Sequence, residues 1–353
     1  MNAAGTILVY RCGALGDTIV SIPAIHAVRA HFPGARLVLM TANDGNGILW
    51  TDEVLRPLGW FDDTIRYSSS DLRSVRRLWR LVRRVKSLGP DAVVHLASDW
   101  NSAARILRDR LFFRLAGVRR FHVPTSSKVT FWGRFRRSRR LYPSEVDRLL
   151  DGLRQSGIAS GAPRFELPRY PTDVERVDRI LREHGLGRER PLVAMCPGSK
   201  QEIKRWPLER YAEVGRRLIA VGGADVVIIG GEDEARAAAT VTRDWPAARW
   251  ASFAGRLTVL ESAELLRRCL FYLGNDTGAM HLAAAVGTRC VAIFSAREPA
   301  RSWHPYGENH IVLRKNVPCA SCYLTRCTEG LRCLTNIGIE EVWDTCQRVM
   351  LFQ

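Results

Sequence analysis

The stretch that most constrains the fold is residues 274–294, which read GNDTGAMHLAAAVGTRCVAIF and follow a short apolar run at residues 270–273. The order of apolar run, Gly-rich polar loop, small-residue segment, turn and second apolar run predicts strand, tight loop, helix, turn and strand. A loop that opens a helix at the carboxyl end of a parallel strand presents unpaired backbone N–H groups and the positive end of the helix dipole. The stretch therefore predicts an α/β domain with an anion site, for which phosphate is the usual ligand.

Several residues of this loop are candidates for the anion site. Asp276 and Thr277 suit the helix cap, Gly278 lets a ligand approach the backbone, and His281 falls in the first helical turn. An ordinary capped helix in an α/β domain gives the same pattern, so the loop by itself leaves both interpretations open.

A second strand–loop–helix pattern opens the chain. Residues 7–10 read ILVY, residues 11–17 read RCGALGD, and apolar residues at helical spacing follow from residue 19. The loop resembles a dinucleotide-binding turn only loosely, because its glycines are spaced GxxG instead of GxGxxG. The ionised form of a carboxylate is favoured at the mouth of a helix, so Asp17 is either a plain N-terminal cap or a general base that faces a cleft.

The basic charge is concentrated in the first half of the chain. Of the 353 residues, 46% are hydrophobic, which is enough for two domains, and three prolines place the linker at residues 161–172. The net charge is +17, with 27 Lys and Arg against 13 Asp and Glu in residues 1–165, and 26 against 23 in the remainder. The excess indicates an anionic partner (phosphorylated lipid, membrane surface or nucleic acid), unless the arginines only decorate solvated helix faces.

Two segments of the first half carry much of this charge. Residues 72–88 predict a basic amphipathic helix, and the strand pattern at residues 92–96 favours a crossover helix whose Arg face is free for phosphates. In residues 126–140, aromatic residues interleave with arginines, among them Arg134, Arg136 and Arg137. That second segment has three interpretations. It is a mobile loop that closes over an anionic acceptor, or a binding site for single-stranded nucleic acid, or simply a solvated loop.

The cysteines and the hydropathy pattern bear on metal binding and location. No apolar run approaches the ~18 residues needed to span a bilayer, so a soluble cytoplasmic protein is expected. Its nine cysteines are then reduced thiols or metal ligands. The spacing of Cys319, Cys322, Cys327 and Cys333 is close to that of a small tetrahedral site for structural zinc or iron. The second pair is not CxxC, so reduced structural thiols are the favoured interpretation.

Four motifs taken together resemble glycosyltransferase family 9, the ADP-heptose:lipopolysaccharide heptosyltransferase family. They are GALGD in the first loop, PGS…KRWP, GGE and NDTGAMHLAAAVGT, and the resemblance extends from residue 7 to about residue 345. It implies an α/β GT-B fold of two facing Rossmann-like, doubly wound domains with a C-terminal crossing helix. We expect an acceptor-binding domain at 1–165, a donor-binding domain at 173–335, and a helix at 336–353 that packs back on the first domain.

The resemblance implies an inverting, metal-independent transfer of heptose from ADP-heptose to the lipopolysaccharide inner core or a related glycan. The absence of any Asp-x-Asp sequence agrees with metal independence. The expected partners are the nucleotide sugar, an anionic glycolipid and, peripherally, the inner membrane, with no nucleic acid and no cofactor required for catalysis. Three alternatives stay open: another nucleotide sugar as donor, an epimerase with the same fold, and a basic nucleic-acid-binding protein.

The resemblance also implies which residues act. Asp17 matches the catalytic base, and Glu232 lies where the family holds the donor nucleoside, with Glu234 as a close rival. The donor-binding positions all lie in the second half and comprise Ser199, Lys204, Glu232, Asp276, Thr277, Gly278 and His281. Because the first half carries the excess of positive charge, we place acceptor binding at Arg134, Arg136 and Arg137.

Overall fold

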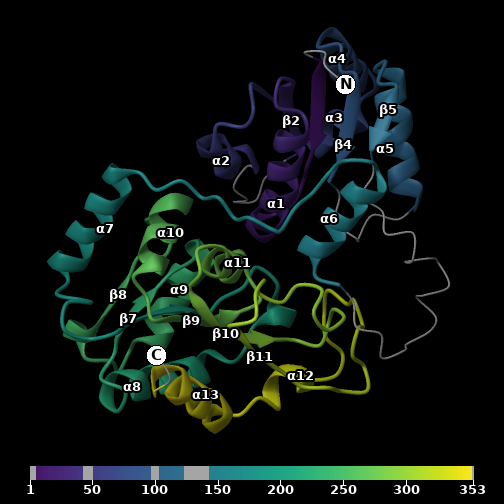
Figure 1. The fold of residues 1–353 in the computed structure, drawn as a ribbon. Helices are drawn as coiled ribbons and strands as arrows, with labels where there is room; N and C mark the ends of the chain where they lie inside the picture. Colours follow the sequence, from purple (N-terminus) through teal and green to yellow (C-terminus); the bar gives the residue numbers. More distant parts are fainter. Residues whose placement is uncertain (1–4, 43–50, 97–102, 123–142, 352–353) are drawn as a thin grey trace. The chain divides into compact units, whose positions relative to one another are not determined.

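The computed structural model describes residues 5–42, 51–96, 103–122 and 143–351 (Figure 1). The chain divides into two compact units, Met1–Glu166 and Leu167–Gln353. A helix begins at Pro171, which corrects the prediction that the linker runs to residue 172. In the part of the chain that the structure describes, no helix has the length and apolar character needed to cross a membrane. The assignment of acceptor and donor binding to the two halves stays a prediction.

The first unit contains a five-stranded parallel sheet with the strand order β3-β2-β1-β4-β5. Its strands are β1 (Thr6–Tyr10), β2 (Arg36–Ala42), β3 (Asp63–Tyr67), β4 (Ala92–His95) and β5 (Arg120–His122). Its helices are α1 (Leu15–His31), α2 (Thr51–Leu55), η1 (Arg56–Leu58), α3 (Ser69–Arg73), α4 (Val75–Ser87), α5 (Ala103–Leu115) and α6 (Glu145–Gln155). The central strand β1 pairs with both β2 and β4, so its ILVY run is buried, as a continuous apolar run in a parallel sheet predicts.

The helix predicted over residues 72–88 is divided in the structure. A short helix, α3, ends at Arg73, the backbone of Ser74 is extended, and α4 begins at Val75. The Asp71 carboxylate accepts the backbone N–H of Ser68 at 2.8 Å, which caps α3 as a separate turn. The helical periodicity therefore starts anew at Ser74.

The helix α4 connects β3 to β4, which confirms the predicted crossover role. Leu81, Val82 and Val85 pack into a core that α4 shares with α5 and with the sheet. Helical spacing also places Val75 and Trp79 on the apolar stripe of this amphipathic helix, but both side chains are exposed. Only the second half of the helix thus covers the sheet.

The second unit contains a six-stranded parallel sheet with the order β11-β10-β9-β6-β7-β8. Its strands are β6 (Leu192–Cys196), β7 (Asp225–Ile228), β8 (Trp250–Ser252), β9 (Phe271–Asn275), β10 (Arg289–Phe294) and β11 (Ile311–Arg314). Its helices are α7 (Pro171–Glu183), η3 (Glu202–Lys204), α8 (Leu208–Ala220), α9 (Glu232–Val241), η4 (Ala247–Arg249), α10 (Val259–Arg267), α11 (Gly278–Ala285), α12 (Arg332–Thr335) and α13 (Ile339–Leu351).

The strand order reverses once in each sheet, between β1 and β4 in the first unit and between β6 and β9 in the second. On either side of such a point the connections leave the sheet in opposite directions, so the loops at the carboxyl ends of the two strands diverge and leave a crevice. Open α/β sheets bind their ligands there. The predicted phosphate loop follows β9, and the loop that leads to Asp17 in α1 follows β1, so both lie at these points.

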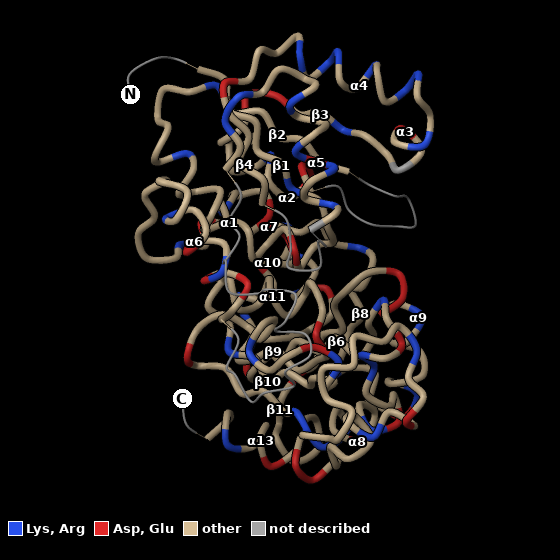
Figure 2. The backbone as a smooth tube through the Cα atoms, turned by 90° about the vertical axis from the view of Figure 1, so that its right-hand side faces the viewer, with Lys and Arg blue, Asp and Glu red and all other residues tan. Residues whose placement is uncertain are grey.

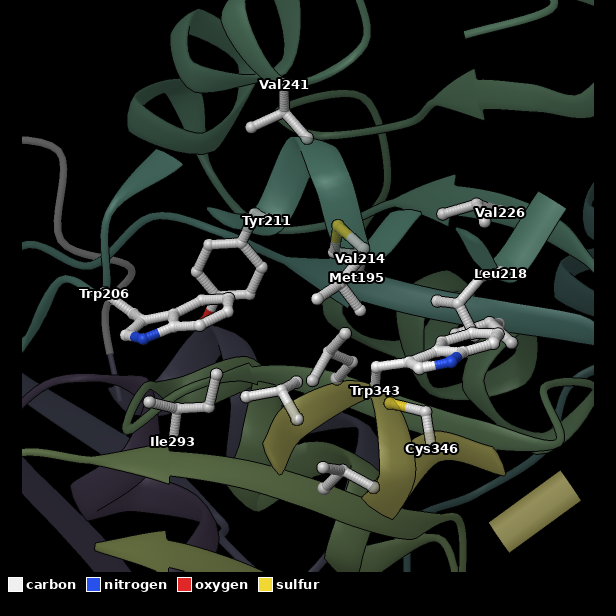
Figure 3. Close-up of a cluster of buried hydrophobic side chains, with 14 of the residues drawn as sticks. Met195, Trp206, Tyr211, Val214, Leu218, Val226, Val241, Ile293, Trp343 and Cys346 are labelled. Carbon is white, nitrogen blue, oxygen red and sulfur yellow. The ribbon is translucent and has the colours of Figure 1, made fainter. Parts of the chain in front are cut away.

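The core of the second unit closes with α13 (Figure 3). Trp206 and Tyr211 lie together at one end of the drawn cluster, and Trp343 and Cys346 of α13 lie at the other. The helix α13 packs on α8, and its buried side chains belong to this core. The predicted packing of this helix on the first domain remains a prediction.

One glycine of this core gives a test of the packing. Gly215 lies in α8 against Trp245, whose indole Nε1 donates to the carbonyl of Ala212 at 2.9 Å. A Cβ at position 215 would lie 1.9 Å from the Trp245 ring. Alanine favours helix by ~1 kcal/mol over glycine, but we expect Gly215→Ala to lower the free energy of unfolding by about 1–3 kcal/mol because the core becomes overpacked.

Urea unfolding of the two proteins measures this difference. Thr240→Ala, at an exposed position of α9, is the control and is expected to change stability little. Equal or greater stability of Gly215→Ala would mean that the Trp245 ring moves aside without cost.

Candidate active site

The predicted phosphate loop has the expected form. β9 ends at Asn275, Thr277 is the N-cap of α11 with an extended backbone, and α11 begins at Gly278. The sequence interpretation of strand, tight loop and helix is therefore confirmed. The backbone N–H groups of the first turn of α11 have no partner within the helix, so they are available to an anion.

A single buried amide joins this loop to the loop after β6. Asn275 Oδ1 accepts the backbone N–H of Trp206 at 3.1 Å and the hydroxyl of Tyr211 at 2.9 Å. Its Nδ2 donates to the carbonyls of Pro197 and Gly198 at 2.8 and 3.0 Å. The amide thus makes two bonds as donor and two as acceptor while fully buried. The sequence analysis did not single out Asn275, although its place as the last residue of the strand was a usable signal.

Lys204 lies beside the phosphate loop, between two carboxylates. Its Nζ is 2.6 Å from Asp276 Oδ2 and 3.3 Å from Glu298 Oε2. Burial acts to lower the pKa of Lys204, but the negative charges of Asp276 and Glu298 outweigh burial and raise that pKa. The ammonium is therefore charged and held at the start of α11, where a diphosphate contact was predicted.

Glu298, which follows β10, is a residue that the sequence analysis missed. It is buried and also contacts the guanidinium of Arg297. Burial raises the pKa of Glu298, and the charge of Asp276 raises it further, against the opposing effects of Lys204 and Arg297. The charges of Lys204, Arg297, Asp276 and Glu298 nearly cancel, so an anion that enters here adds negative charge beside a carboxyl group whose pKa is already raised.

Two aromatic residues, Trp303 and His304, lie near His281. The His281 ring packs edge-on against Trp303 with centroids 5.9 Å apart, and His304 packs on Phe294 at 5.0 Å. Burial and the nearby Arg314 lower the pKa of His304 to about 4, so this ring is neutral at neutral pH. No local pattern pointed to Trp303 or His304, because both lie beyond the strand–loop–helix motif.

The two glutamates after β7 have different environments. Glu234 is buried, and its Oε2 accepts the backbone N–H of Gly231 at 2.8 Å, which caps α9. A Cβ at Gly198 would lie 2.5 Å from Glu234 Oε1, so the loop after β6 passes close to this side chain. Glu232 is exposed at the first position of α9. Glu234 thus caps the helix through one oxygen, and a nucleoside contact stays a prediction for Glu232, with Glu234 still the rival.

In the first unit, Asp17 caps its own helix. It is the third residue of α1, and its Oδ2 accepts the backbone N–H of Ala14 at 3.0 Å. A Cβ at Gly13 would lie 2.5 Å from that of Asp17, and the φ of Gly13 is +145°, so the turn requires glycine. The side chain remains 25% exposed, and Oδ1 lies 3.6 Å from Arg11 Nη2. Capping through one oxygen leaves the other for chemistry, so both interpretations of Asp17 are compatible.

Arg11, which lies beside this carboxylate, is another residue that the sequence analysis missed. The side chain is fully buried, and its guanidinium donates to the carbonyls of Leu96, after β4, and of Asp17. Burial lowers the pKa of Arg11, while the negative charge of Asp17 opposes that change. Arg11 therefore ties the loop after β1 to the end of β4 at the point where the strand order reverses.

Comparison with known proteins gives the family. The model of glycosyltransferase family 9 (heptosyltransferase) matches residues 78–332.

The chain belongs to glycosyltransferase family 9.

Relatives and solved structures agree with this assignment. Escherichia coli lipopolysaccharide heptosyltransferase 3 is 25% identical over 303 residues, 84% of this chain and 85% of that protein. A family 9 glycosyltransferase from Veillonella parvula DSM 2008 has a TM-score of 0.76 at 19% identity and covers 100% of this chain and 99% of its own. E. coli ADP-heptose lps heptosyltransferase II has a TM-score of 0.69 at 20% identity, with 98% of each chain covered. The family 9 protein is thus a glycosyltransferase with the predicted GT-B fold of two Rossmann-like domains.

The remaining residues that were predicted to bind ligands in the family 9 enzyme are only partly described by the structure. Arg134, Arg136 and Arg137 lie outside the described residues. Ser199 is buried after β6, and its carbonyl accepts the Nε of Arg205 at 2.6 Å. The ligand roles predicted for Ser199 and for the phosphate loop stay predictions.

The cysteines near the C-terminus were considered as metal ligands. In the described parts of the chain, no group of three or more His, Cys, Asp or Glu side chains is arranged to hold a metal ion. Cys319, Cys322, Cys327 and Cys333 are free thiols, and the Sγ of Cys327 accepts the backbone N–H groups of Glu329 and Leu331, each at 3.3 Å. These bonds involve Cys327 alone, and the roles of the four cysteines, as structural thiols or as metal ligands, stay predictions.

We expect Asp17→Asn to lower kcat of this enzyme by at least ~100-fold, because a general base contributes roughly 10²–10⁴ to the rate. The amide oxygen of asparagine still accepts the Ala14 N–H, so the melting temperature should change little. Asp71→Asn, which changes a helix-capping carboxylate elsewhere in the same unit, is the matched control and should keep full turnover. Turnover of Asp17→Asn close to that of the control would reduce Asp17 to a cap.

The raised pKa of Glu298 predicts that anion binding depends on pH. A diphosphate beside Glu298 raises the pKa of this group further, so binding is expected to take up a proton and to weaken as pH rises through that pKa. Glu298→Gln should bind inorganic pyrophosphate at least as tightly and with less proton uptake. Calorimetry in buffers of different ionisation enthalpy measures the uptake, with exposed Glu308→Gln as control. Equal proton uptake in the wild type and in Glu298→Gln contradicts this role.

Proposed function

We propose that this glycosyltransferase transfers heptose from ADP-heptose to a sugar hydroxyl of the lipopolysaccharide inner core, with inversion and without a catalytic metal ion. The observation that carries the proposal is Lys204, held charged at the start of α11 by the carboxylates of Asp276 and Glu298. The relatives are lipopolysaccharide heptosyltransferases, and they suggest the sugar and the acceptor class.

The proposed chemistry follows from the negative charge of Asp17 in the first unit and the positive charge of Lys204 in the second. Asp17 accepts the proton of the acceptor hydroxyl, whose oxygen attacks the anomeric carbon of heptose. The bond from that carbon to the diphosphate breaks on the opposite face, so the configuration inverts, and ADP leaves with the electron pair. The departing charge is stabilised by the Lys204 ammonium and by the backbone N–H groups at the start of α11.

The remaining parts of the proposal concern the rest of the substrate. Ser199, Thr277, Gly278 and His281 contact the donor phosphates, and Glu232 contacts the nucleoside. Arg134, Arg136 and Arg137, which lie outside the described residues, bind the anionic acceptor. The enzyme works in the cytoplasm in peripheral contact with the inner membrane, where the acceptor lies.

The decisive experiment is transfer to a heptose-free core acceptor, followed by mass spectrometry. We expect the acceptor to gain one heptose residue from ADP-heptose and to gain no sugar from UDP or GDP sugars. The anomeric configuration of the product, read by NMR, should be opposite to that of the donor. Transfer from a different nucleotide sugar in preference to ADP-heptose would overturn the choice of donor and leave the family unaffected.

Variants then separate donor from acceptor binding. Lys204→Ala should weaken ADP binding by ~1.5–3 kcal/mol, because a charge-assisted contact is lost. Lys200→Ala, an exposed lysine four residues away, is the control. Arg136→Ala with Arg137→Ala should raise KM for a phosphorylated acceptor, leave ADP affinity unchanged and matter less at high salt. The reverse pattern would show that the two halves have been assigned the wrong substrates.

A further inference from the structure

The outer faces of α4 and α5 carry large apolar side chains in the open. Val75 and Trp79 of α4 are 71% and 51% exposed, and Leu107, Leu111 and Leu115 of α5 are 68%, 58% and 53% exposed. The two helices contact one another and share one core, so these side chains belong to one surface of the first unit. Apolar side chains that are gathered in this way mark an interaction site more often than isolated ones do.

The same surface is strongly basic. The helices α4 and α5 read VRRLWRLVRRVKS and AARILRDRLFFRL, which is ten Lys and Arg against one acid, Asp109. Asp109 is mostly buried, bonded to His95 at 3.0 Å and paired with Arg108 at 2.6 Å, so it offsets the charge of one arginine alone. Figure 2 shows the basic residues repeated along α4.

A solvated face does not explain this pattern. Like charges three and four residues apart destabilise a helix, and Arg76, Arg80 and Arg83 are spaced in this way. None of the three pairs with a carboxylate among the described residues. Asp71 lies close enough to Arg77 and Arg80 for their charges to help lower its pKa, but its carboxylate is occupied by the Ser68 N–H.

Another helix of the same chain shows what an ordinary solvated face looks like here. α7 reads PTDVERVDRILRE, in which three arginines alternate with four acids. The high arginine content of the chain therefore does not by itself produce a helix without acids. The repulsion along α4 remains unless an anionic partner neutralises it.

We propose that the α4–α5 surface, defined by Val75, Arg76, Trp79, Arg80, Arg83, Leu107, Leu111 and Leu115, docks the enzyme on an anionic lipid bilayer. Arginines attract the anionic headgroups, and an exposed tryptophan between them enters the interface of the bilayer, where its ring has both apolar and polar contacts. The leucines of α5 add apolar area at the same surface. A bilayer fits because it offers a charged layer and an apolar layer together.

This inference extends the proposed function, since the acceptor class named there is a membrane glycolipid, but vesicle binding needs neither donor nor acceptor. The experiment is sedimentation of the full chain with vesicles of phosphatidylglycerol and phosphatidylethanolamine, beside neutral phosphatidylcholine vesicles. We expect binding to the anionic vesicles alone, weaker at high salt. No binding to anionic vesicles, or equal binding to neutral ones, overturns the proposal.

Matched variants assign the binding to this surface. Arg76→Glu with Arg80→Glu and Arg83→Glu should weaken vesicle binding by at least ~100-fold, since each basic residue near an anionic surface contributes about 5-fold and reversal removes more than neutralisation. Arg179→Glu with Arg182→Glu, at exposed positions of α7, should have little effect. An equal loss in both charge variants means that net charge alone drives binding and overturns the surface.

The apolar contribution has its own pair of variants. Trp79→Ser should weaken vesicle binding several-fold, while Val221→Ser, at an exposed position after α8, should not. Pyrophosphate binding and the melting temperature, measured on every variant, show that the second unit and the fold are intact. If single-stranded DNA binds more tightly than the vesicles and the α4 variants lose that binding, the surface is a nucleic-acid site and the lipid proposal is wrong. Loss of vesicle binding with normal transfer to a soluble acceptor separates this proposal from the proposed function.

Discussion

The four hydrogen bonds of the Asn275 side chain are the interaction on which the candidate phosphate site of the second unit depends. The Nδ2 group donates to two carbonyls of the loop after β6, which joins that loop to the end of β9. The Oδ1 atom accepts the Trp206 N–H and the Tyr211 hydroxyl, and the rings of both residues are part of the core. A buried donor or acceptor without a partner is costly, so any shift of one loop leaves polar groups of the other unsatisfied. The position of Lys204 relative to α11 is therefore set by the packing of the core.

The first unit uses a charged group for the same purpose. Arg11 bonds the backbone of the loop after β1 and the end of β4, while its charge faces Asp17. Both arrangements stand where the strand order of their sheet reverses, which leaves a crevice open to a ligand. A buried guanidinium is tolerated only when it is bonded and paired, so Arg11 and Asp17 depend on each other.

Local sequence patterns predicted the helices and strands, but they did not predict contacts between residues that lie far apart in the sequence. The βαβ units around Asp17 and around residues 274–294 were predictable because apolar runs, glycine turns and helical spacing are local signals. Glu298 was not, because its role comes from a contact with Lys204, which lies far away in the sequence. The exposure of Trp79 was missed for a similar reason: helical periodicity tells which residues share a face, but the extent of the sheet beneath decides which of them it covers.

The place of α13 in the core has a consequence for how the chain is made. Trp343 and Cys346 close a core whose strands come from β6 onward, so this core lacks a wall until the ribosome has synthesised α13. All five strands of the first unit are complete long before that point. The first unit is then able to fold during synthesis, whereas the second exposes apolar strands to chaperones until translation has passed Val349.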